Sequence, residues 1–158
     1  MSNEMDILLV EDNPEDVEIT LRAFQKHHIA NKIHVVRDGE EALECLFGTG
    51  RYAECSPCEN TRLILLDLKL PKIDGLEVLQ RCKTDPRTKH IPIVVLTSSR
   101  EEEDLARSYN FGVNSYVVKP VDIDEYFRSI GDVGRYWVLL NRTPTEHPRA
   151  QTITPAGR

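Results

Sequence analysis

Five side chains suited to phosphate chemistry each stand directly after a short apolar run of the sequence. They are three carboxylates, a hydroxyl and an ammonium, on Glu11, Asp12, Asp67, Thr97 and Lys119. Carboxylates that lie together raise each other's pKa unless a cation neutralises them. Ligands that offer only oxygen and carry high charge favour a hard cation, Mg²⁺ or Mn²⁺, that keeps several of its waters.

A divalent cation, a lysine and a hydroxyl around one further carboxylate form a phosphoryl-transfer site. Asp67 is central in chain order, and we expect its carboxylate to be the nucleophile that forms an acyl phosphate. Lys119 and the cation would balance the charge of the phosphoryl oxygens, and Thr97 would donate a hydrogen bond to one of them. Each residue alone also has a structural interpretation, such as Asp12 or Asn13 as a helix cap, so the prediction depends on their convergence.

Apolar segments alternate along the chain with segments of helical periodicity. The strand-like segments are residues 7–10, 33–36, 63–66, 93–96 and 116–118. Helices are predicted to begin near Asn13, Asp38, Gly75, Ser99 and Asp122 and to end near His28, Phe47, Lys83, Tyr109 and Leu140. Of the predicted starts, Asn13, Asp38, Ser99 and Asp122 have capping side chains. A long polar loop is predicted over residues 48–62.

The predicted fold is a doubly wound α/β sandwich, because several strands are apolar throughout and need cover on both faces. Right-handed crossovers between five parallel strands give the flavodoxin-like (βα)5 sheet with strand order 2-1-3-4-5. Ligands of such sheets bind beyond the carboxyl ends of the strands. The polar side chains described above stand at those ends, so the fold predicts that they converge.

Length and charge disfavour several classes of protein. The chain has 158 residues and a formal net charge of −6, which fits one domain and disfavours nucleic acid or an anionic membrane as a partner. Its apolar runs fall far short of the roughly 20 residues of a membrane span, and its acidic start does not resemble a signal peptide. We expect a cytoplasmic protein with one domain over residues 1–140 and a flexible tail over residues 141–158.

Cys55 and Cys58 have the spacing of a metal or redox pair. A zinc site needs further ligands, and no second pair follows at a suitable spacing. A redox pair is expected at the start of a helix, whereas these cysteines precede a strand. We therefore interpret them as incidental loop residues.

The motifs around the polar side chains resemble the receiver domain of two-component response regulators, the family of the chemotaxis regulator. The resemblance covers about residues 5–130 and rests on motifs at residues 10–13, 65–71, 74–75, 95–98 and 116–120. It implies that Asp67 is the phospho-acceptor for a histidine kinase. It also implies that Glu11, Asp12, Asp67 and the backbone carbonyl of Lys69 hold the metal ion.

The same resemblance implies a signalling switch, not an enzyme with external substrates. Thr97 would be the switch hydroxyl, Tyr116 the switch aromatic and Lys119 the phosphate-sensing base, and the Lys119–Pro120 bond would be cis. A phosphoryl group on Asp67 would draw Thr97 inward by a charge-assisted hydrogen bond and let Tyr116 rotate inward. The surface of the fourth and fifth helices would then favour a partner or a second copy.

A narrower resemblance is to the small stand-alone regulators that are paired with bacterial phytochrome kinases. It rests on the insertion at residues 48–62, the run at residues 70–75 and the long last helix. It implies a light-sensing kinase as the phosphohistidine donor and a homodimer through the fourth helix, fifth strand and fifth helix. That dimer surface would carry aromatic side chains, namely Tyr109, Tyr126, Phe127, Tyr136 and Trp137.

Two other functions are weighed against this one. A phosphatase or phosphomutase with an Asp nucleophile usually has a second Asp two residues later, where this chain has Lys69. A phosphate-independent scaffold would be favoured by a missing acid or lysine, but every receiver position is filled. Lys69 and Ser99 depart from the residues of the chemotaxis protein, and we predict a different acyl-phosphate lifetime. A DNA-binding regulator is disfavoured because little chain follows the receiver.

Overall fold

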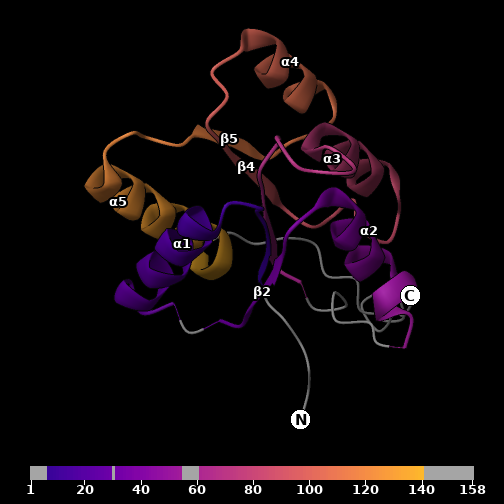
Figure 1. Ribbon diagram of the computed structural model, residues 1–158, viewed down its shortest axis with the longest axis horizontal. Helices are drawn as coiled ribbons and strands as arrows, with labels where there is room; N and C mark the ends of the chain where they lie inside the picture. The colour runs from indigo at the N-terminus through magenta and orange to yellow at the C-terminus, as the bar shows by residue number, and fades with distance from the viewer. Residues whose placement is uncertain (1–6, 30, 55–60, 141–158) are drawn as a thin grey trace, which may run out of the picture.

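The computed structural model describes residues 7–29, 31–54 and 61–140, without the side chains of the last two residues. Five parallel strands form one sheet in the order β2-β1-β3-β4-β5 (Figure 1), which confirms the predicted flavodoxin-like order. The strands are β1 Ile7–Val10, β2 Ile33–Val36, β3 Leu63–Leu66, β4 Ile93–Thr97 and β5 Ser115–Val118. The three central strands are buried at every position because helices cover both faces of the sheet.

Five α-helices connect and cover the strands. They are α1 Pro14–Lys26, α2 Gly39–Phe47, α3 Gly75–Thr84, α4 Glu102–Asn110 and α5 Ile123–Gly134. Side chains cap four of them by accepting hydrogen bonds from backbone N–H groups of the first turn; the caps are Asn13, Asp38, Asp74 and Asp122. These short polar side chains at the end of each preceding loop fix where the helices begin.

The cap predicted at Ser99 is wrong. Helix α4 follows Glu101, whose side chain makes no capping hydrogen bond. The Ser99 hydroxyl instead donates to Asp104 Oδ2 (2.6 Å) and accepts a hydrogen bond from the Glu101 N–H (3.3 Å). A nearby buried carboxylate is the stronger partner for the hydroxyl because its hydrogen bond is charge-assisted.

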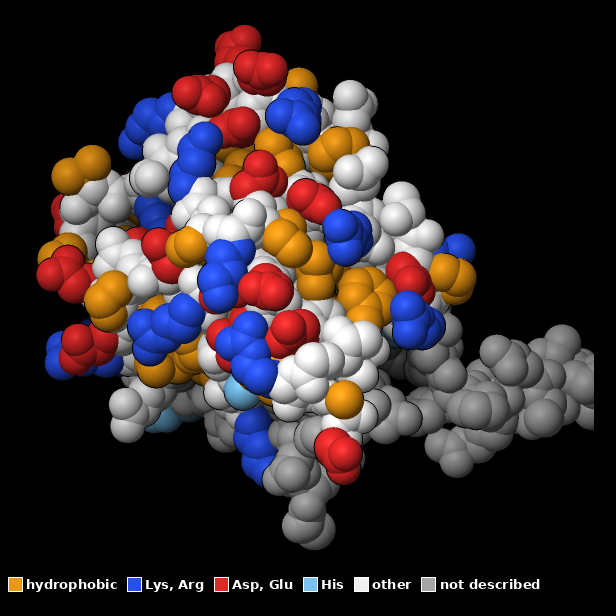
Figure 2. All heavy atoms as spheres, turned by 45° about the vertical axis from the view of Figure 1, so that its right-hand side comes forward, with side chains coloured by type: hydrophobic (Ala, Val, Ile, Leu, Met, Phe, Trp, Pro, Cys, Tyr) orange, Lys and Arg blue, Asp and Glu red, His pale blue; other side chains and the backbone are white. Residues whose placement is uncertain are grey.

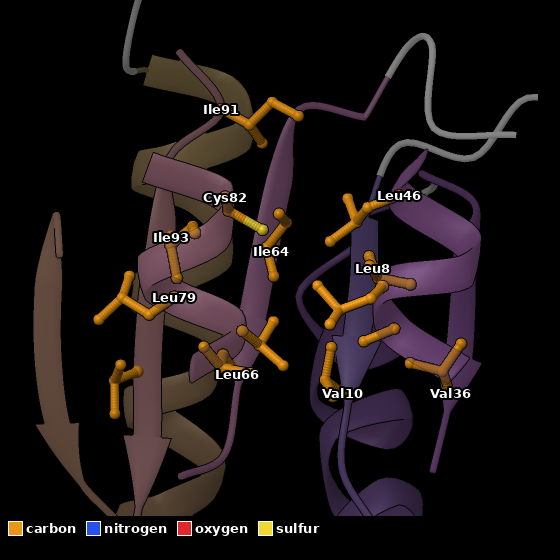
Figure 3. Close-up of a cluster of buried hydrophobic side chains, with 14 of the residues drawn as sticks. Leu8, Val10, Val36, Leu46, Ile64, Leu66, Leu79, Cys82, Ile91 and Ile93 are labelled. Atoms are coloured by element: carbon orange, nitrogen blue, oxygen red, sulfur yellow. The ribbon is translucent and has the colours of Figure 1, made fainter. Parts of the chain in front are cut away.

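The helices lie in two layers on either side of the sheet (Figure 1). Helices α1 and α5 pack on one face, and α2 and α3 pack on the other with α4 next to α3. Figure 3 shows the cluster beneath α2 and α3, which includes Leu8, Val10, Ile64 and Ile93 from the strands and Leu46, Leu79 and Cys82 from the helices. Both faces of the sheet are therefore covered by packed apolar side chains, which leaves the ends of the strands for polar side chains.

The last helical segment has two parts. Helix α5 ends at Gly134, and a π-helical segment, η3, follows over Arg135–Leu140. The α5 backbone approaches α1 so closely that a Cβ atom at Gly134 would overlap Phe24 and Ile29. Helix α5 is therefore packed directly against α1.

The insertion before β3 begins with a 3₁₀ turn, η1 Gly50–Tyr52. The Tyr52 hydroxyl donates to Glu41 Oε2 of α2 (2.9 Å) and lies 2.8 Å from His34 Nε2 of β2. These contacts anchor the start of the predicted loop to the first half of the fold. Cys55, Cys58 and the predicted tail at residues 141–158 lie outside the described residues.

The visible surface carries charges of both signs. Figure 2 shows acidic and basic side chains interspersed over one face, with acidic ones gathered at the top over α4. The first turn of α4 contains the acidic residues Glu102, Glu103 and Asp104. Among the described residues, none of the helices combines the length and apolar composition that a bilayer crossing requires.

Candidate functional site

Backbone hydrogen bonds at the carboxyl edge of the sheet position the predicted side chains. The N–H of Asp67 donates to the Val10 carbonyl (3.0 Å), and the N–H of Lys119 donates to the Thr97 carbonyl (2.7 Å). Both bonds extend the strand pairing beyond the last strand residue. The side chains of Asp67 and Lys119 therefore start from a backbone that the sheet holds in place.

Three carboxylates meet at this edge, as predicted. One oxygen from each of Glu11, Asp12 and Asp67 lies within 4.8 Å of the others. Glu11 and Asp67 are buried and Asp12 is exposed. Burial raises the pKa of the Glu11 carboxyl to about 7, although the neighbouring Lys119 ammonium acts in the opposite direction. The group thus offers oxygen ligands that are open to water on one side, which fits a hydrated divalent cation.

Lys119 contacts three carboxylates, and we name Lys119, Glu11, Asp16 and Asp67 the Lys119 cluster. The Lys119 Nζ lies 2.7 Å from Glu11 Oε1, 2.7 Å from Asp16 Oδ2 and 3.4 Å from Asp67 Oδ2. Its side chain is only 8% exposed. Burial alone would lower the pKa of Lys119, but the surrounding carboxylates raise it above its usual range. The ammonium is therefore a fixed positive charge at the centre of the site.

A second set of polar contacts joins α4 to the loop after β3, and we name Ser99, Asp104 and Lys69 the Asp104 cluster. The buried Asp104 carboxylate accepts the Ser99 hydroxyl (2.6 Å), and Lys69 Nζ lies 3.4 Å from the same oxygen. The Ser99 hydrogen bond and the Lys69 charge hold the pKa of Asp104 below its usual value. Lys69 itself is mostly exposed. Its ammonium is directed to α4, while its backbone N–H donates to Asp67 Oδ1 (3.4 Å).

Thr97 and Tyr116 both contact Ser99. Thr97 is fully buried, and its Oγ1 accepts a hydrogen bond from the Ser99 N–H (3.2 Å). The Tyr116 hydroxyl donates to the Ser99 carbonyl (3.2 Å), and partial burial raises the pKa of this tyrosine. Ser99 therefore links Thr97, the predicted switch hydroxyl, to Tyr116, the predicted switch aromatic.

Asp16 and Asp104 belong to the site, although neither was predicted from the sequence. Asp16 lies in the first turn of α1, where an acidic residue is favoured by the helix dipole alone. Asp104 has the same location in α4. No local signal separates these acids from their solvated neighbours, since the Lys119–Asp16 contact joins residues 103 positions apart.

The comparisons with known proteins decide the family. Residues 7–130 of the chain match the family "Response regulator receiver domain". The chain belongs to this family. The receiver is 40% identical over 132 residues to Response regulator Rcp1 of Synechocystis, with 84% of this chain and 88% of that protein covered. It is 41% identical over 138 residues to the "Probable methanogenesis regulatory protein FilR2" of Methanothrix harundinacea, with 87% and 86% covered.

Solved structures similar to this chain include other response regulators. The "bacteriophytochrome response regulator AtBRR" is 55% identical, with a TM-score of 0.68 over 88% of this chain and 99% of that one. The Mn²⁺-bound form of Rcp1 gives a TM-score of 0.82 at 35% identity, over 89% of this chain and 99% of that one. A relative that binds a divalent metal agrees with the oxygen ligands of Glu11, Asp12 and Asp67 in this receiver.

The five aromatic residues predicted for a dimer surface are not equally placed. Tyr109 on α4 and Tyr136 after α5 are exposed. Phe127 and Trp137 are half-buried against the core beneath α1 and α5. The placement of Tyr126 on a surface is wrong, because this residue is buried in that core and burial raises its pKa to about 12. Its position on α5 faces α1, and helical periodicity alone did not identify that face.

The expected cis bond between Lys119 and Pro120 is also corrected. The described residues contain no cis peptide bond. The trans form is the lower in energy for most bonds that precede proline. In this receiver the trans bond is compatible with the backbone pairing of Lys119 to Thr97.

Proposed function

We propose that Asp67 of this receiver accepts a phosphoryl group from the phosphohistidine of a sensor histidine kinase, in a reaction that requires Mg²⁺ or Mn²⁺. The observation that supports this most is the meeting of Glu11, Asp12 and Asp67 within 4.8 Å beside the Lys119 ammonium. A nucleophilic carboxylate, a cation site and a fixed positive charge are together the requirements of phosphoryl transfer.

Each residue has a part in the proposed transfer. An Asp67 oxygen forms the bond to phosphorus as the bond between phosphorus and the histidine nitrogen breaks, and the imidazole leaves with the bonding electron pair. Glu11, Asp12, Asp67 and the Lys69 carbonyl would hold the cation, which neutralises charge on the phosphoryl oxygens when bound. Lys119, whose Nζ lies 3.4 Å from Asp67 Oδ2, would contribute a second positive charge.

The switch would operate through Ser99. In the present structure Thr97 and Tyr116 are both hydrogen-bonded to the backbone of Ser99. A phosphoryl group on Asp67 would attract the Thr97 hydroxyl, and the space left would let Tyr116 turn inward. The change is a population shift whose size is set by how differently the two states bind the phosphoryl group. It alters the surface of α4, β5 and α5.

The kinase is proposed to be a bacterial phytochrome in the cytoplasm. The support is the 55% sequence identity of this chain with a bacteriophytochrome response regulator. The net charge of −6 disfavours nucleic acid and anionic membranes as partners. The exposed Tyr109 and Tyr136 are proposed as part of a homodimer surface. Turnover of external phosphoesters is not expected, because Lys69 stands where a phosphatase has its acid.

Acetyl phosphate tests the central proposal. The full chain incubated with acetyl phosphate and Mg²⁺ should gain the mass of one phosphoryl group, and a chelator should prevent the gain. The Asp67→Asn variant should show no gain, while Asp132→Asn, which removes an exposed carboxylate on α5, should behave like wild type. A wild-type chain that stays unmodified would favour the phosphate-independent scaffold instead.

A further inference from the structure

Asp16 binds the Lys119 ammonium as closely as Glu11 does, yet it belongs to neither the cation ligands nor the acceptor. An ammonium has three N–H donors, and in this structure they face Glu11, Asp16 and Asp67. The carboxylate group that fits a divalent cation consists of Glu11, Asp12 and Asp67. Among the described carboxylates that contact Lys119, Asp16 is therefore the one that is neither a proposed cation ligand nor the proposed acceptor.

The start of α1 fixes Asp16 where it can hold Lys119. Asn13 caps the helix, and its side chain accepts hydrogen bonds from the N–H groups of Glu15 (2.9 Å) and Asp16 (3.4 Å). One turn later, the Thr20 hydroxyl donates to the Asp16 carbonyl (2.9 Å). The Asp16 side chain is 22% exposed, so it extends into the site from a backbone that is fixed on both sides.

An ordinary first-turn acid does not explain this geometry. Such residues interact with the helix dipole from exposed positions for a small gain in stability, and Glu15 is exposed in this way. Asp16 instead approaches an ammonium that is 8% exposed, at 2.7 Å. A carboxylate that pairs with a buried cation restricts where that cation can lie, because any other position leaves a charge unpaired.

We propose that Asp16 is a positioning residue for phosphoryl transfer, an inference that rests on the proposed function. Asp16 would hold the Lys119 ammonium in place while Glu11 and Asp67 release it and bind the divalent cation and the phosphoryl group. Without Asp16, Lys119 would be paired only with Glu11 and Asp67. The ammonium would then compete directly with the cation for those oxygens and would occupy no fixed position beside the phosphoryl group.

The experiment compares Asp16→Asn with Glu15→Gln in the full chain. Both variants remove one carboxylate from the first turn of α1, and only the first removes a contact to Lys119. The readouts are the rate of phosphorylation by acetyl phosphate, the affinity for Mn²⁺ measured without any phosphodonor, and the proton–nitrogen NMR signal of the Lys119 ammonium. Thermal unfolding checks that each variant is folded.

We expect Asp16→Asn to lose about tenfold in phosphorylation rate, since small misplacements of a reacting group have effects of that order or more. Mn²⁺ affinity should fall as well, and the Lys119 signal should shift or broaden. Asp16→Glu, which retains the charge, should recover part of the rate. Glu15→Gln should stay within about twofold of wild type, because its charge lies in solvent.

Two outcomes would overturn the inference. One is an unchanged Lys119 signal in Asp16→Asn, and the other is equal rates and Mn²⁺ affinities in Asp16→Asn and Glu15→Gln. If Asp16→Asn does not fold, Asp16→Ser replaces it, because serine removes the same charge with a short polar side chain. Absence of phosphorylation in the wild type would contradict the proposed function instead, and the Mn²⁺ and NMR readouts would still decide the role of Asp16.

Discussion

The two polar clusters at the sheet edge are built in different ways. In the Lys119 cluster one buried ammonium lies between three carboxylates, two from the start of the chain (Glu11 and Asp16) and one that follows β3 (Asp67). In the Asp104 cluster one buried carboxylate is held by a neighbouring hydroxyl and by a mostly exposed lysine. Charge pairing in the first is strong and incomplete, because carboxylates outnumber the ammonium, whereas pairing in the second is nearly balanced and partly in solvent.

This difference suits the two clusters to different tasks, cation binding for the Lys119 cluster and the positioning of α4 for the Asp104 cluster. A buried excess of negative charge has a high cost unless a further cation enters, so the Lys119 cluster is suited to bind one. A balanced set of contacts gains little from any ligand. The Asp104 cluster is suited instead to hold α4 against the loop after β3 for as long as Asp104 keeps its contacts to Ser99 and Lys69.

The largest predicted effect is the loss of stability in Lys119→Met compared with Lys69→Met. Removal of Lys119 leaves Glu11 and Asp16 without their buried counter-charge, which should cost about 3–5 kcal/mol in the free energy of unfolding. Removal of the exposed Lys69 should cost less than about 1 kcal/mol. Urea unfolding in the presence of a chelator measures both. Added Mg²⁺ should recover more stability in Lys119→Met than in wild type, and similar losses in the two variants would erase the contrast between the clusters.

The second-largest predicted effect is the loss of stability in Ser99→Ala compared with Ser98→Ala. In Ser99→Ala the buried Asp104 carboxylate loses its 2.6 Å hydrogen bond, at an expected cost of about 1.5–3 kcal/mol. Ser98 is exposed, and Ser98→Ala is the matched control, with an expected change within about 0.5 kcal/mol. Urea unfolding again gives the comparison. A Ser99→Ala variant as stable as its control would mean that Lys69 alone holds Asp104.

Metal affinity should depend on pH through the Lys119 cluster. The pKa of Glu11 is raised to about 7 by burial, and a divalent cation binds the ionised carboxylate, so each cation displaces a proton below that pH. Mg²⁺ affinity should fall about tenfold per pH unit below about 7 and level off above it. Glu11→Gln should remove this dependence. A flat profile in the wild type between pH 5 and 7, measured by cation titration, contradicts the assignment.

The same shift has a consequence for stability. The folded state holds the Glu11 proton more tightly than the unfolded state, whose carboxyl titrates near 4.5. Without a cation, this group therefore lowers stability as pH rises from about 4.5 through 7. A cation should offset that loss, since it takes the place of the proton.

Much of the fold was predictable because it depends on local patterns. The all-apolar runs at β1, β3 and β4 identify buried parallel strands, and the caps Asn13 and Asp38 identify helix starts. The meeting of Glu11, Asp12 and Asp67 followed from the rule that carboxyl ends of parallel strands share an edge. Each of these features is specified by neighbours in sequence or by topology.

The features that could not be predicted depend on side-chain directions across the fold. Asp16 reaches Lys119 only because the fold brings the first turn of α1 beside the residue that follows β5, and its sequence context matches that of the exposed Glu15. Tyr126 is buried because α5 turns that side toward α1. The Ser99 hydroxyl was predicted to cap the next helix, but the packing of α4 places the Asp104 carboxylate within hydrogen-bond distance of it.

The smallest predicted effect is on the lifetime of the acyl phosphate. The Lys69 side chain begins two residues after Asp67, but its ammonium lies 3.4 Å from Asp104 Oδ2, so the ammonium is drawn away from Asp67, the proposed phospho-acceptor. Lys69→Asn should alter the hydrolysis rate of the acyl phosphate about fivefold or less, because the ion pair is exposed. Asp104→Asn releases the ammonium and should also change the rate, but not when Lys69 is already asparagine. Hydrolysis followed by mass spectrometry after removal of acetyl phosphate gives the rates. Equal lifetimes in wild type and Lys69→Asn would limit the Asp104 cluster to holding α4, with no effect on the chemistry at Asp67.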